Sequence, residues 1–283
     1  MKVLITGSKG NIGSDGFINY FKKIFNGTIY LTDIKGKRKN NFFKVDLTDE
    51  KQLKKLPKNI DIIVHMASIG LPTKIQNIYR VNFFSTLNLL HYYKNTNLKN
   101  FIFFSSVCVY GLPNTGVLPD YVPVDEKHPE KTVDHYGMSK SVVEKLLYHY
   151  SKISNFSIIV LRLGSVITKT KNTYEFRMDL IKNDKNYREG GELWNFVDYR
   201  DLARGIKTII EKETGKFDIF NFTSDNHLMK EKNSVLLKYF GKKIEIKDKK
   251  FPESRKSFFD NSKFKNYFNF KFLFPASFKI LSD

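Results

Sequence analysis

The sequence predicts an α/β fold built on a doubly wound parallel sheet, and three observations support this prediction. Short runs that are apolar throughout, such as KVLIT at 2–6 and SIIVLRL at 157–163, alternate with longer segments of helical periodicity. Strands of this kind are buried on both faces, and parallel strands need helical crossovers between them. The length of 283 residues fits one large domain with a small additional region.

The first part of the chain reads as a regular succession of strands and helices. Residues 48–56, TDEKQLKKL, are expected to form a helix with Thr48 as its N-cap, because a threonine side chain accepts hydrogen bonds from the free N–H groups of a first turn. We expect the other elements in this order: a strand at 2–6, a helix at 11–25, strands at 28–33, 41–46 and 61–67, a helix at 76–95, a strand at 100–106, a helix at 135–153 and a strand at 157–163.

Towards the C-terminus the pattern is less regular. We expect a helix near 200–212, a strand near 217–222 and a helix near 227–240, whereas the tail, rich in Lys and Phe, shows no clear element. The segment from Tyr110 to Tyr136 contains several Pro and Gly residues and reads as a long loop, which is usually functional or disordered. We predict a dinucleotide-binding domain made of residues 1–165 and 195–222. Residues 166–194 and 223–283 are predicted to form a small substrate-binding region.

The charge of the chain favours anionic ligands. It has 48 basic and 29 acidic side chains, a net charge of +19, and a field of that sign attracts anions in general. The lysines are spread along the chain and no nucleic-acid-binding motif is present, so we expect no nucleic-acid partner. A phosphorylated small molecule fits the charge better, although a biased genome composition explains the abundance of Lys and Asn equally well.

Membrane and secretory signals are missing from the sequence. No apolar run approaches the ~18 residues that a membrane span needs, and the first residues, MKVLITG, enter a strand directly and leave no room for a signal peptide. Cys108 is the single cysteine and has no partner for an internal disulfide. We therefore expect a cytoplasmic protein with no membrane partner.

A glycine-rich turn follows the first strand. In TGSKGNIG, Gly7, Gly10 and Gly13 stand where the strand passes into the first helix. Glycine permits positive φ angles and a close approach of the backbone to a pyrophosphate, which the free N–H groups of a helix N-terminus also attract. The spacing is GxxGxxG, not the GxGxxG of the standard dinucleotide fingerprint, so the turn needs support from its context.

An acidic residue supplies that context. Asp33 ends the second strand, twenty residues after Gly13, where a carboxylate accepts hydrogen bonds from the ribose hydroxyls of NAD and repels the 2′-phosphate of NADP. The basic residues that follow it weaken the preference, and the alternative is an aspartate that caps a helix after a strand. Asp46, which ends the third strand, either contacts adenine or forms a turn. Together these features predict an NAD site.

The stretch YGMSK places Tyr136 and Lys140 four residues apart, on one face of a helix. They are either a catalytic pair or ordinary helix surface. A phenol has a pKa near 10, and lowering it to ~7 needs about 4 kcal/mol, which a cation at ~4 Å supplies at an effective dielectric constant of 20. The pair therefore makes sense as a general base that takes the proton of a sugar hydroxyl as hydride leaves its carbon.

Several motifs resemble those of the extended short-chain dehydrogenase/reductase family, the NAD-dependent nucleotide-sugar epimerases and dehydratases. They are TGSKGNIG at 6–13 (TGxxGxxG), HMAS at 65–68 (HxAA), VNFFSTLNLL at 81–90 (NVxGTxNLL), SSVCVYG at 105–111 (SSxxVYG), YGMSK at 136–140 (YxxxK) and NFVDYRDLA at 195–203 (FVxVxDLA). The resemblance covers residues 1 to about 222 and implies a Rossmann fold. It assigns catalysis to Ser106, Tyr136 and Lys140. The implied cofactor-binding residues are Gly7, Gly10, Asn11, Ile12, Gly13, Asp33, Asp46, Leu47, Met66, Ala67, Ser68, Asn82, Tyr136 and Lys140.

Departures from the family pattern narrow the chemistry. Val107 and Cys108 replace the Asp-Glu pair of the sugar dehydratases, so we do not expect dehydration. GDP-fucose synthase has an acid–base cysteine at the place of Cys108, but the histidine that accompanies it is missing here, and Cys108 reads better as a small apolar filler. Ser165 and Trp194 replace the Asn and Arg that usually touch the sugar nucleotide.

The histidines do not suggest a metal site. We interpret His65 as a packing or cofactor-edge residue and His128 as a solvated residue of the long loop, and no cluster has the spacing of metal ligands.

These observations favour an NAD-dependent nucleotide-sugar oxidoreductase or epimerase that moves hydride between a sugar carbon, most often C4, and nicotinamide. The motifs do not distinguish an epimerase from a dehydrogenase. The stretch RLGS at 162–165 and the short C-terminal part also resemble free-sugar and uronate dehydrogenases. A redox-sensing or scaffold protein on the same fold is a further alternative, which the intact Ser-Tyr-Lys set disfavours.

We also expect a homodimer, because two helices carry apolar residues on more than one face. Members of the family pair these helices across a two-fold axis; the alternative is burial by the long loop. The residues are Ile78, Val81, Phe84, Leu87 and Leu90 in the first helix, and Val142, Val143, Leu146, Leu147 and Tyr150 in the second.

Overall fold

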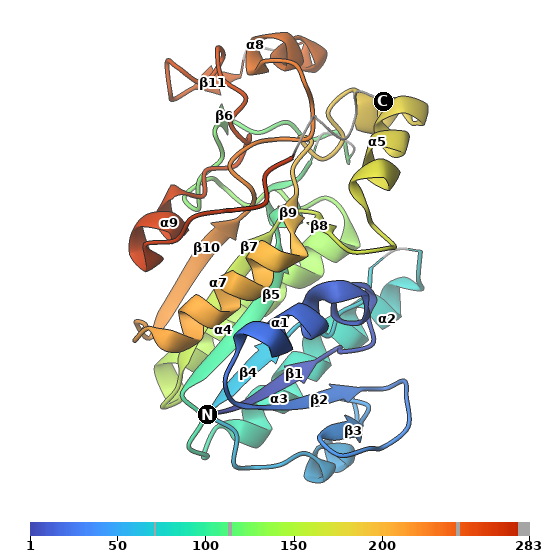
Figure 1. The fold of residues 1–283 in the computed structure, drawn as a ribbon, viewed down its shortest axis with the longest axis vertical. Helices are drawn as coiled ribbons and strands as arrows, with labels where there is room; N and C mark the ends of the chain where they lie inside the picture. Colours follow the sequence, from blue (N-terminus) through green and yellow to red (C-terminus); the bar gives the residue numbers. More distant parts are fainter. Residues whose placement is uncertain (71, 113–114, 242–243, 277–283) are drawn as a thin grey trace.

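A seven-stranded parallel sheet forms the centre of the computed structural model, which describes residues 1–70, 72–112, 115–241 and 244–276 (Figure 1). The strand order is β10-β7-β5-β4-β1-β2-β3, which confirms the predicted doubly wound parallel sheet. The strands are β1 (Lys2–Thr6), β2 (Thr28–Asp33), β3 (Phe42–Lys44), β4 (Ile62–His65), β5 (Asn100–Ser106), β7 (Ser157–Leu163) and β10 (Phe217–Phe222).

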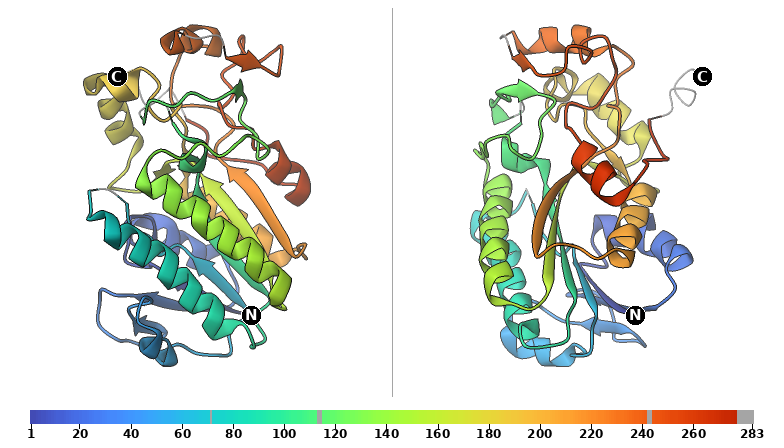
Figure 2. Two further views of the ribbon diagram at one scale, coloured as in Figure 1. Left: turned by 180° about the vertical axis from the view of Figure 1, so that it is seen from behind. Right: turned by 90° about the vertical axis from the view of Figure 1, so that its left-hand side faces the viewer.

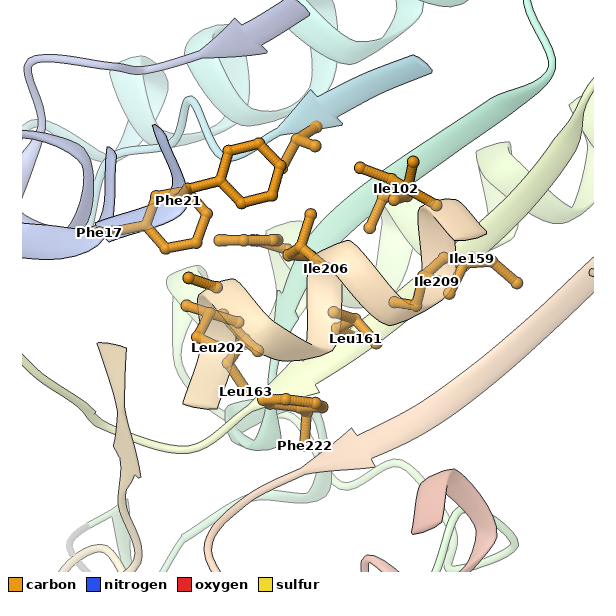
Figure 3. Close-up of a cluster of buried hydrophobic side chains, with 14 of the residues drawn as sticks. Phe17, Phe21, Ile102, Ile159, Leu161, Leu163, Leu202, Ile206, Ile209 and Phe222 are labelled. Atoms are coloured by element: carbon orange, nitrogen blue, oxygen red, sulfur yellow. The ribbon is translucent and has the colours of Figure 1, made fainter. Parts of the chain in front are cut away.

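Helices cover both faces of this sheet (Figure 2). One face packs against α3 (Ser85–Tyr93) and α4 (His135–Ile153), and the other against α1 (Ile18–Ile24) and α7 (Tyr199–Glu211). Figure 3 shows the apolar side of α7 on the sheet, where Leu202, Ile206 and Ile209 meet residues of β5, β7 and β10. The apolar strands are thus buried on both faces, as their sequences predict.

The predicted helices at 11–25 and 76–95 are both interrupted. The second comprises α2 (Ile75–Tyr79), a π-helical segment Arg80–Phe84 and α3. The first contains a π-helical segment Gly13–Phe17 in which Asp15 and Gly16 leave helical geometry. Asp15 turns to accept hydrogen bonds from the backbone of Thr170 and Lys171. Gly16 has φ +110°, and a Cβ there would lie 2.8 Å from the ring of Tyr199.

Two local predictions in the first half were wrong. Asp49 and not Thr48 is the N-cap of the short 3₁₀ helix Glu50–Lys55, because the Asp49 carboxylate accepts the Lys51 N–H. Thr48 instead donates its N–H and hydroxyl to Asp46. The strand predicted at 41–46 is limited to the three residues of β3.

A small upper region lies beyond the C-terminal ends of the strands (Figure 1). Its apolar cluster joins segments 107–124, 167–196 and 228–259 and includes Trp194, Phe240 and Phe258. The elements are the 3₁₀ turns Val107–Tyr110 and Leu237–Phe240, the short strands β6 (Tyr121–Val122), β8 (Val166–Ile167), β9 (Val197–Asp198) and β11 (Glu245–Ile246), and the helices α5 (Tyr174–Asn183), α6 (Lys185–Arg188) and α8 (Asn233–Leu236).

The C-terminal third differs most from expectation. The predicted helix at 200–212 and strand at 217–222 are confirmed as α7 and β10. The helix predicted at 227–240 begins only at Asn233, because the preceding segment is irregular and Leu228 donates its backbone N–H to the Trp194 carbonyl, outside the segment. The tail contains a helix that the sequence did not reveal, α9 (Ser262–Phe268), which packs on β10.

The long loop is also more ordered than its composition suggests, and the interpretation of His128 as solvated was wrong. Its imidazole is 2% exposed and lies between the rings of Tyr110 and Tyr121. Nε2 of His128 accepts the backbone N–H of Asp120 at 2.9 Å, so the histidine holds the loop together.

His65, at the end of β4, connects three elements inside the core. Its Nδ1 lies 2.7 Å from the Thr6 hydroxyl of β1, and its Nε2 lies 2.9 Å from the Thr86 hydroxyl of α3. The side chain is buried, and burial lowers the pKa of His65 to about 3, with the charge of Lys140 as a smaller cause. His65 is therefore a neutral packing residue.

This burial predicts an acid-dependent loss of stability. The unfolded chain takes up a proton on His65 below about pH 6.5, whereas the folded chain does so only near pH 3. The contribution of neutral His65 to the free energy of unfolding is therefore complete above pH 6.5 and is lost as the pH falls towards 3. Between pH 6 and 5, His65→Asn should reduce the slope of unfolding free energy against pH by ~1.4 kcal/mol per unit. Urea titrations at several pH values measure it; an unchanged slope would mean that the histidine is protonated in the fold.

Candidate active site

A large cavity of about 1200 Å³ opens at the C-terminal ends of β1, β4, β5 and β7. It runs from the glycine turn to the upper region, as expected for a ligand site in a doubly wound sheet. All the predicted catalytic and cofactor-binding residues line it except Asn82, which does not belong to the described lining.

The glycine turn is packed too tightly for any other residue type. Gly7 has φ +65°, and a Cβ there would lie 2.6 Å from the Cα of Ala67. A Cβ on Gly13 would lie 2.6 Å from the Met66 side chain and 2.7 Å from the Ser8 carbonyl oxygen. The turn is thus pressed against the end of β4, which leaves its backbone as one wall of the cavity.

Asp33 is fixed at the end of β2. One carboxylate oxygen accepts the Lys9 N–H and the other the Lys35 N–H, both at 2.9 Å. Each oxygen keeps a second lone pair for a ribose hydroxyl. In the described chain the next helical turn begins only at Glu50, so Asp33 does not cap a helix.

Asp46 forms a turn and also lines the cavity beside Leu47, so both interpretations of this residue are compatible with its position. Asn82 acts indirectly. Its side-chain oxygen accepts the Ile69 N–H, and its amide nitrogen donates to the Ile69 carbonyl. The same nitrogen also donates to the Ser139 hydroxyl at 2.8 Å. It thereby joins the segment after β4 to helix α4.

The start of α4 places Tyr136 beside Ser106. Asp134 caps the helix by accepting the Gly137 N–H at 2.8 Å, so Tyr136 stands in the first turn. A Cβ on Gly137 would lie 2.6 Å from the Cys108 carbonyl oxygen, and only glycine allows this contact with the turn after β5. The Tyr136 side chain hydrogen bonds Ser106 and Ser68.

Lys140 lies one turn further along α4 and is fully inside the protein. Its ammonium donates to the Phe104 carbonyl of β5 at 2.8 Å and lies 5.6 Å from the centre of the Tyr136 ring. Burial lowers the pKa of Lys140 to about 7, and the Glu144 carboxylate opposes this effect.

Burial raises the pKa of Tyr136 above its ordinary value, and the hydrogen bonds from Ser68 and Ser106 only partly oppose it. The lowered pKa predicted from the sequence assumed a cation, Lys140, at ~4 Å from the phenol and an effective dielectric constant of 20. In the structure the phenol is desolvated and Lys140 is bonded to a carbonyl. When NAD is bound, its positively charged nicotinamide ring adds a second cation that favours the phenolate.

A buried ion cluster beneath the site was not predicted. Arg162 of β7 donates twice to Glu144 of α4, and also to Glu130 at 3.0 Å. Glu144 accepts the Ser105 hydroxyl at 2.5 Å. Two signals were available in the sequence: a single arginine in the apolar strand SIIVLRL, and a glutamate four residues after Lys140.

Cys108 lines the cavity, and burial raises the pKa of its thiol to about 12. The thiol is therefore protonated at neutral pH, in line with a filler. Trp194 does not line the described cavity; it packs into the upper cluster against Phe240 and Phe258. Ser165 does line it, together with Arg177 and Glu192, two residues that the sequence did not single out.

The model of the NAD dependent epimerase/dehydratase family matches residues 3–222. The chain therefore belongs to this family, is an NAD-dependent enzyme of the extended short-chain dehydrogenase/reductase type, and uses NAD as its cofactor. The glycine turn, Asp33 and the strand ends fit that cofactor, because they offer backbone to its phosphates and a carboxylate to its ribose.

Individual similarities are moderate. The chain is 29% identical over 223 residues to a putative UDP-glucose 4-epimerase of Methanocaldococcus jannaschii, with 71% of each protein covered. Its fold matches a UDP-glucose 4-epimerase from Bifidobacterium longum in complex with NAD⁺ and UDP (TM-score 0.71, 20% identity, 98% of this chain and 95% of that one). It also matches a glucuronic acid dehydrogenase from Chromohalobacter salexigens (TM-score 0.70, 18% identity, 99% and 87%). The two structures support the fold alone.

Neither a membrane-spanning helix nor a metal-binding cluster is found in residues 1–70, 72–112, 115–241 and 244–276. None of the described helices is long and apolar enough to cross a membrane. Within the same residues, no three His, Cys, Asp or Glu side chains are grouped so as to hold a metal ion.

Asp33 should set the cofactor preference. Wild-type protein should bind NAD more tightly than NADP, because the carboxylate repels a 2′-phosphate, and Asp33→Asn should narrow that difference by removing the charge and keeping the size. Fluorescence titrations with both cofactors measure it. Tighter binding of NADP by the wild type would contradict the role of Asp33.

The catalytic set predicts three different responses. Tyr136→Phe removes only the hydroxyl, so NAD affinity should survive while turnover of any accepted sugar falls by roughly 10²–10⁴. Lys140→Ala should lower both turnover and NAD affinity and move the inflection of the pH–rate profile upward, because it removes the cation beside the phenol. Ser106→Ala should cost less than Tyr136→Phe. Wild-type turnover by Tyr136→Phe would show that YGMSK is only helix surface.

Proposed function

We propose that this enzyme oxidises a nucleotide sugar at C4, passing hydride to NAD, and returns or retains the hydride as an epimerase or a dehydrogenase. The observation that carries the proposal is the meeting of Ser106, Tyr136 and Lys140 in the same cavity as the glycine turn and Asp33. A sugar hydroxyl beside Tyr136 would then lie within reach of the nicotinamide end of the cofactor.

Each residue has a separate task in this scheme. Tyr136, as phenolate, takes the proton of the sugar hydroxyl while hydride leaves the carbon that carries it. Ser106, which already bonds Tyr136, donates to or accepts from the reacting oxygen and keeps it in line. Lys140 favours the phenolate electrostatically and holds a ribose hydroxyl of the cofactor. Hydride returned to the opposite face gives the epimer, and hydride kept on the cofactor gives the ketone.

A free sugar as substrate is the second candidate. It is favoured by the loss of the usual nucleotide contacts, since Trp194 is turned into the upper cluster and Ser165 replaces an asparagine. RLGS, at the end of β7, also resembles the free-sugar and uronate dehydrogenases. The intact catalytic set disfavours a non-catalytic sensor. Cytoplasmic location stays a prediction.

A substrate panel tests the proposal. Purified protein is mixed with NAD and, separately, with UDP-hexoses, other nucleotide sugars and free sugars, while NADH absorbance and product stereochemistry are recorded. Inversion at C4 of a nucleotide sugar supports the epimerase, and stoichiometric NADH supports the dehydrogenase. Turnover of free sugars only would replace the nucleotide sugar as substrate, and no turnover of any member would contradict the proposal.

We also propose that the enzyme is a homodimer paired through α3 and α4, which lie side by side on one face of the molecule (Figure 2). Ile78, Leu90 and Val143 are buried within the chain, but Phe84 is 48% exposed and Val142 is 36% exposed. Met138 on the same face of α4 is exposed as well. Apolar side chains left open on adjacent helices favour a partner with the same surface.

Substitution of this surface should separate the subunits. Light scattering at micromolar concentration should give the mass of a dimer for the wild type and of a monomer for Phe84→Glu/Val142→Glu, because two buried charges would face their copies. Val235→Glu, at an exposed apolar position of α8, is the matched control and should stay dimeric. A wild-type monomer would refute the dimer.

A further inference from the structure

A polar cluster in the wall of the cavity is not used by the proposed chemistry. Arg177 of α5 is 7% exposed and donates to Glu192, and to the Ser165 hydroxyl at 2.8 Å. The Ser165 hydroxyl donates to Glu192 at 2.6 Å, and the Tyr187 hydroxyl does so at 3.3 Å. All four residues line the cavity.

The cluster is held in place by the backbone around it. Asn195 accepts the Ser165 N–H at 3.0 Å, and its amide nitrogen donates to the carbonyl of Glu192. A Cβ on Gly164 would lie 2.4 Å from the Asn195 side-chain oxygen, so the segment after β7 fits closely against Asn195. The wall is therefore pre-organised, as a specificity site requires.

The cluster also lies near the reacting groups. The Glu192 carboxylate is close enough to Cys108 to raise the pKa of that thiol, although burial is the larger cause. Cys108 lies against the start of α4, because a Cβ on Gly137, the residue after Tyr136, would be 2.6 Å from the Cys108 carbonyl oxygen. Because Tyr136, Ser165 and Glu192 line the same cavity, a sugar whose hydroxyl meets Tyr136 can present other ring substituents to Glu192 and Ser165.

The charges of the cluster cancel within the protein. Glu192 already occupies the anion position on the Arg177 guanidinium, so a carboxylate on the sugar would have to displace Glu192 or stand beside it as a like charge. A hydroxyl meets no such conflict. It can donate to Oε1 of Glu192, where Tyr187 is the only donor among the described residues, and accept from an Arg177 N–H other than those of Nη2, which serve Ser165 and Glu192.

We propose that the Arg177–Glu192 pair selects a sugar ring with uncharged, hydroxyl-bearing substituents and excludes a uronic acid. The inference rests on the proposed function, since it assigns the substrate class of the same cavity. It also distinguishes between substrates that the sequence left open. A neutral sugar, free or nucleotide-linked, is expected to bind, and a uronate is not.

The wild-type protein tests this directly with sugar pairs that differ only at C6. UDP-galactose is compared with UDP-galacturonate, and free galactose with free galacturonate, so that any diphosphate charge is common to both members. Binding to the NADH-loaded protein is measured by calorimetry and turnover as kcat/KM. The neutral member of at least one pair should be favoured by on the order of 100-fold, from one like-charge contact.

Two variants test the residues. Glu192→Gln keeps the shape of the side chain and removes the carboxylate that pairs with Arg177. The preference for the neutral sugar over the uronate should therefore shift towards the uronate by at least ~10-fold. Arg177→Met/Glu192→Gln removes both charges. This double variant should lose the improved binding of the uronate seen in Glu192→Gln and should still bind the neutral sugar. Glu211→Gln, which removes an exposed carboxylate paired with Lys207 on α7, is the matched control and should keep the wild-type ratio.

The outcomes distinguish this inference from the proposed function. Preference of the wild type for a uronate, equal binding of both members of every pair, or binding of none would overturn the inference, as would an unchanged ratio in a folded Glu192→Gln. Neutral sugars that bind with the expected preference but are not oxidised would support the inference and contradict the proposed function.

Discussion

The buried ammonium of Lys140 is the constraint on which the site depends. A lysine side chain is rarely buried without partners, and this one has the Phe104 carbonyl at 2.8 Å and the Phe103 ring at 4.8 Å. Because the carbonyl belongs to β5, the contact fixes α4 against the end of that strand, and Tyr136, one turn earlier, is brought beside Ser106. The position of Tyr136, the proposed general base, thus follows from where the buried charge of Lys140 can be accommodated.

The ion cluster below it makes this burial tolerable. Glu144 opposes the loss of charge on Lys140, and Arg162, with Glu130 behind it, neutralises the carboxylate in turn. A buried pair of this kind adds little net stability, but removing one member leaves an uncompensated charge. The role of the cluster here is to orient α4 on the sheet. Glu144 and Arg162 connect α4 to β7, and Lys140 connects it to β5. The glycine turn and Asp33 line the same cavity at the strand ends, where they would hold the cofactor under the proposed function.

Local patterns allowed the sheet and the glycine turn to be predicted, and they singled out Ser106, Tyr136 and Lys140, which the structure brings together in one cavity. The strand at 217–222 and the helix that begins near YGMSK were predicted from the sequence pattern alone, and both are present as β10 and α4. Features that depend on distant partners were missed. The helix break at Asp15 needs the backbone of Thr170, burial of His128 needs Asp120 and two tyrosines, and Arg177 meets Glu192 across an irregular segment. The prediction of a lowered pKa for Tyr136 was wrong for the same reason. The spacing in the sequence gives the distance to Lys140 but not the loss of water around the phenol.

The central claim is that hydride leaves C4 of the sugar for nicotinamide while Tyr136 takes the proton. The most direct measurement uses the best substrate of the panel with deuterium at C4, in one turnover, followed by mass spectrometry of both the sugar and the nicotinamide cofactor. The account predicts that the wild type keeps the deuterium, on the nicotinamide ring if the hydride stays on the cofactor or at C4 of the epimer if it returns, and that Tyr136→Phe forms almost none of either product over the same time. Sugar converted with its deuterium lost to water, and an unlabelled cofactor, would contradict it.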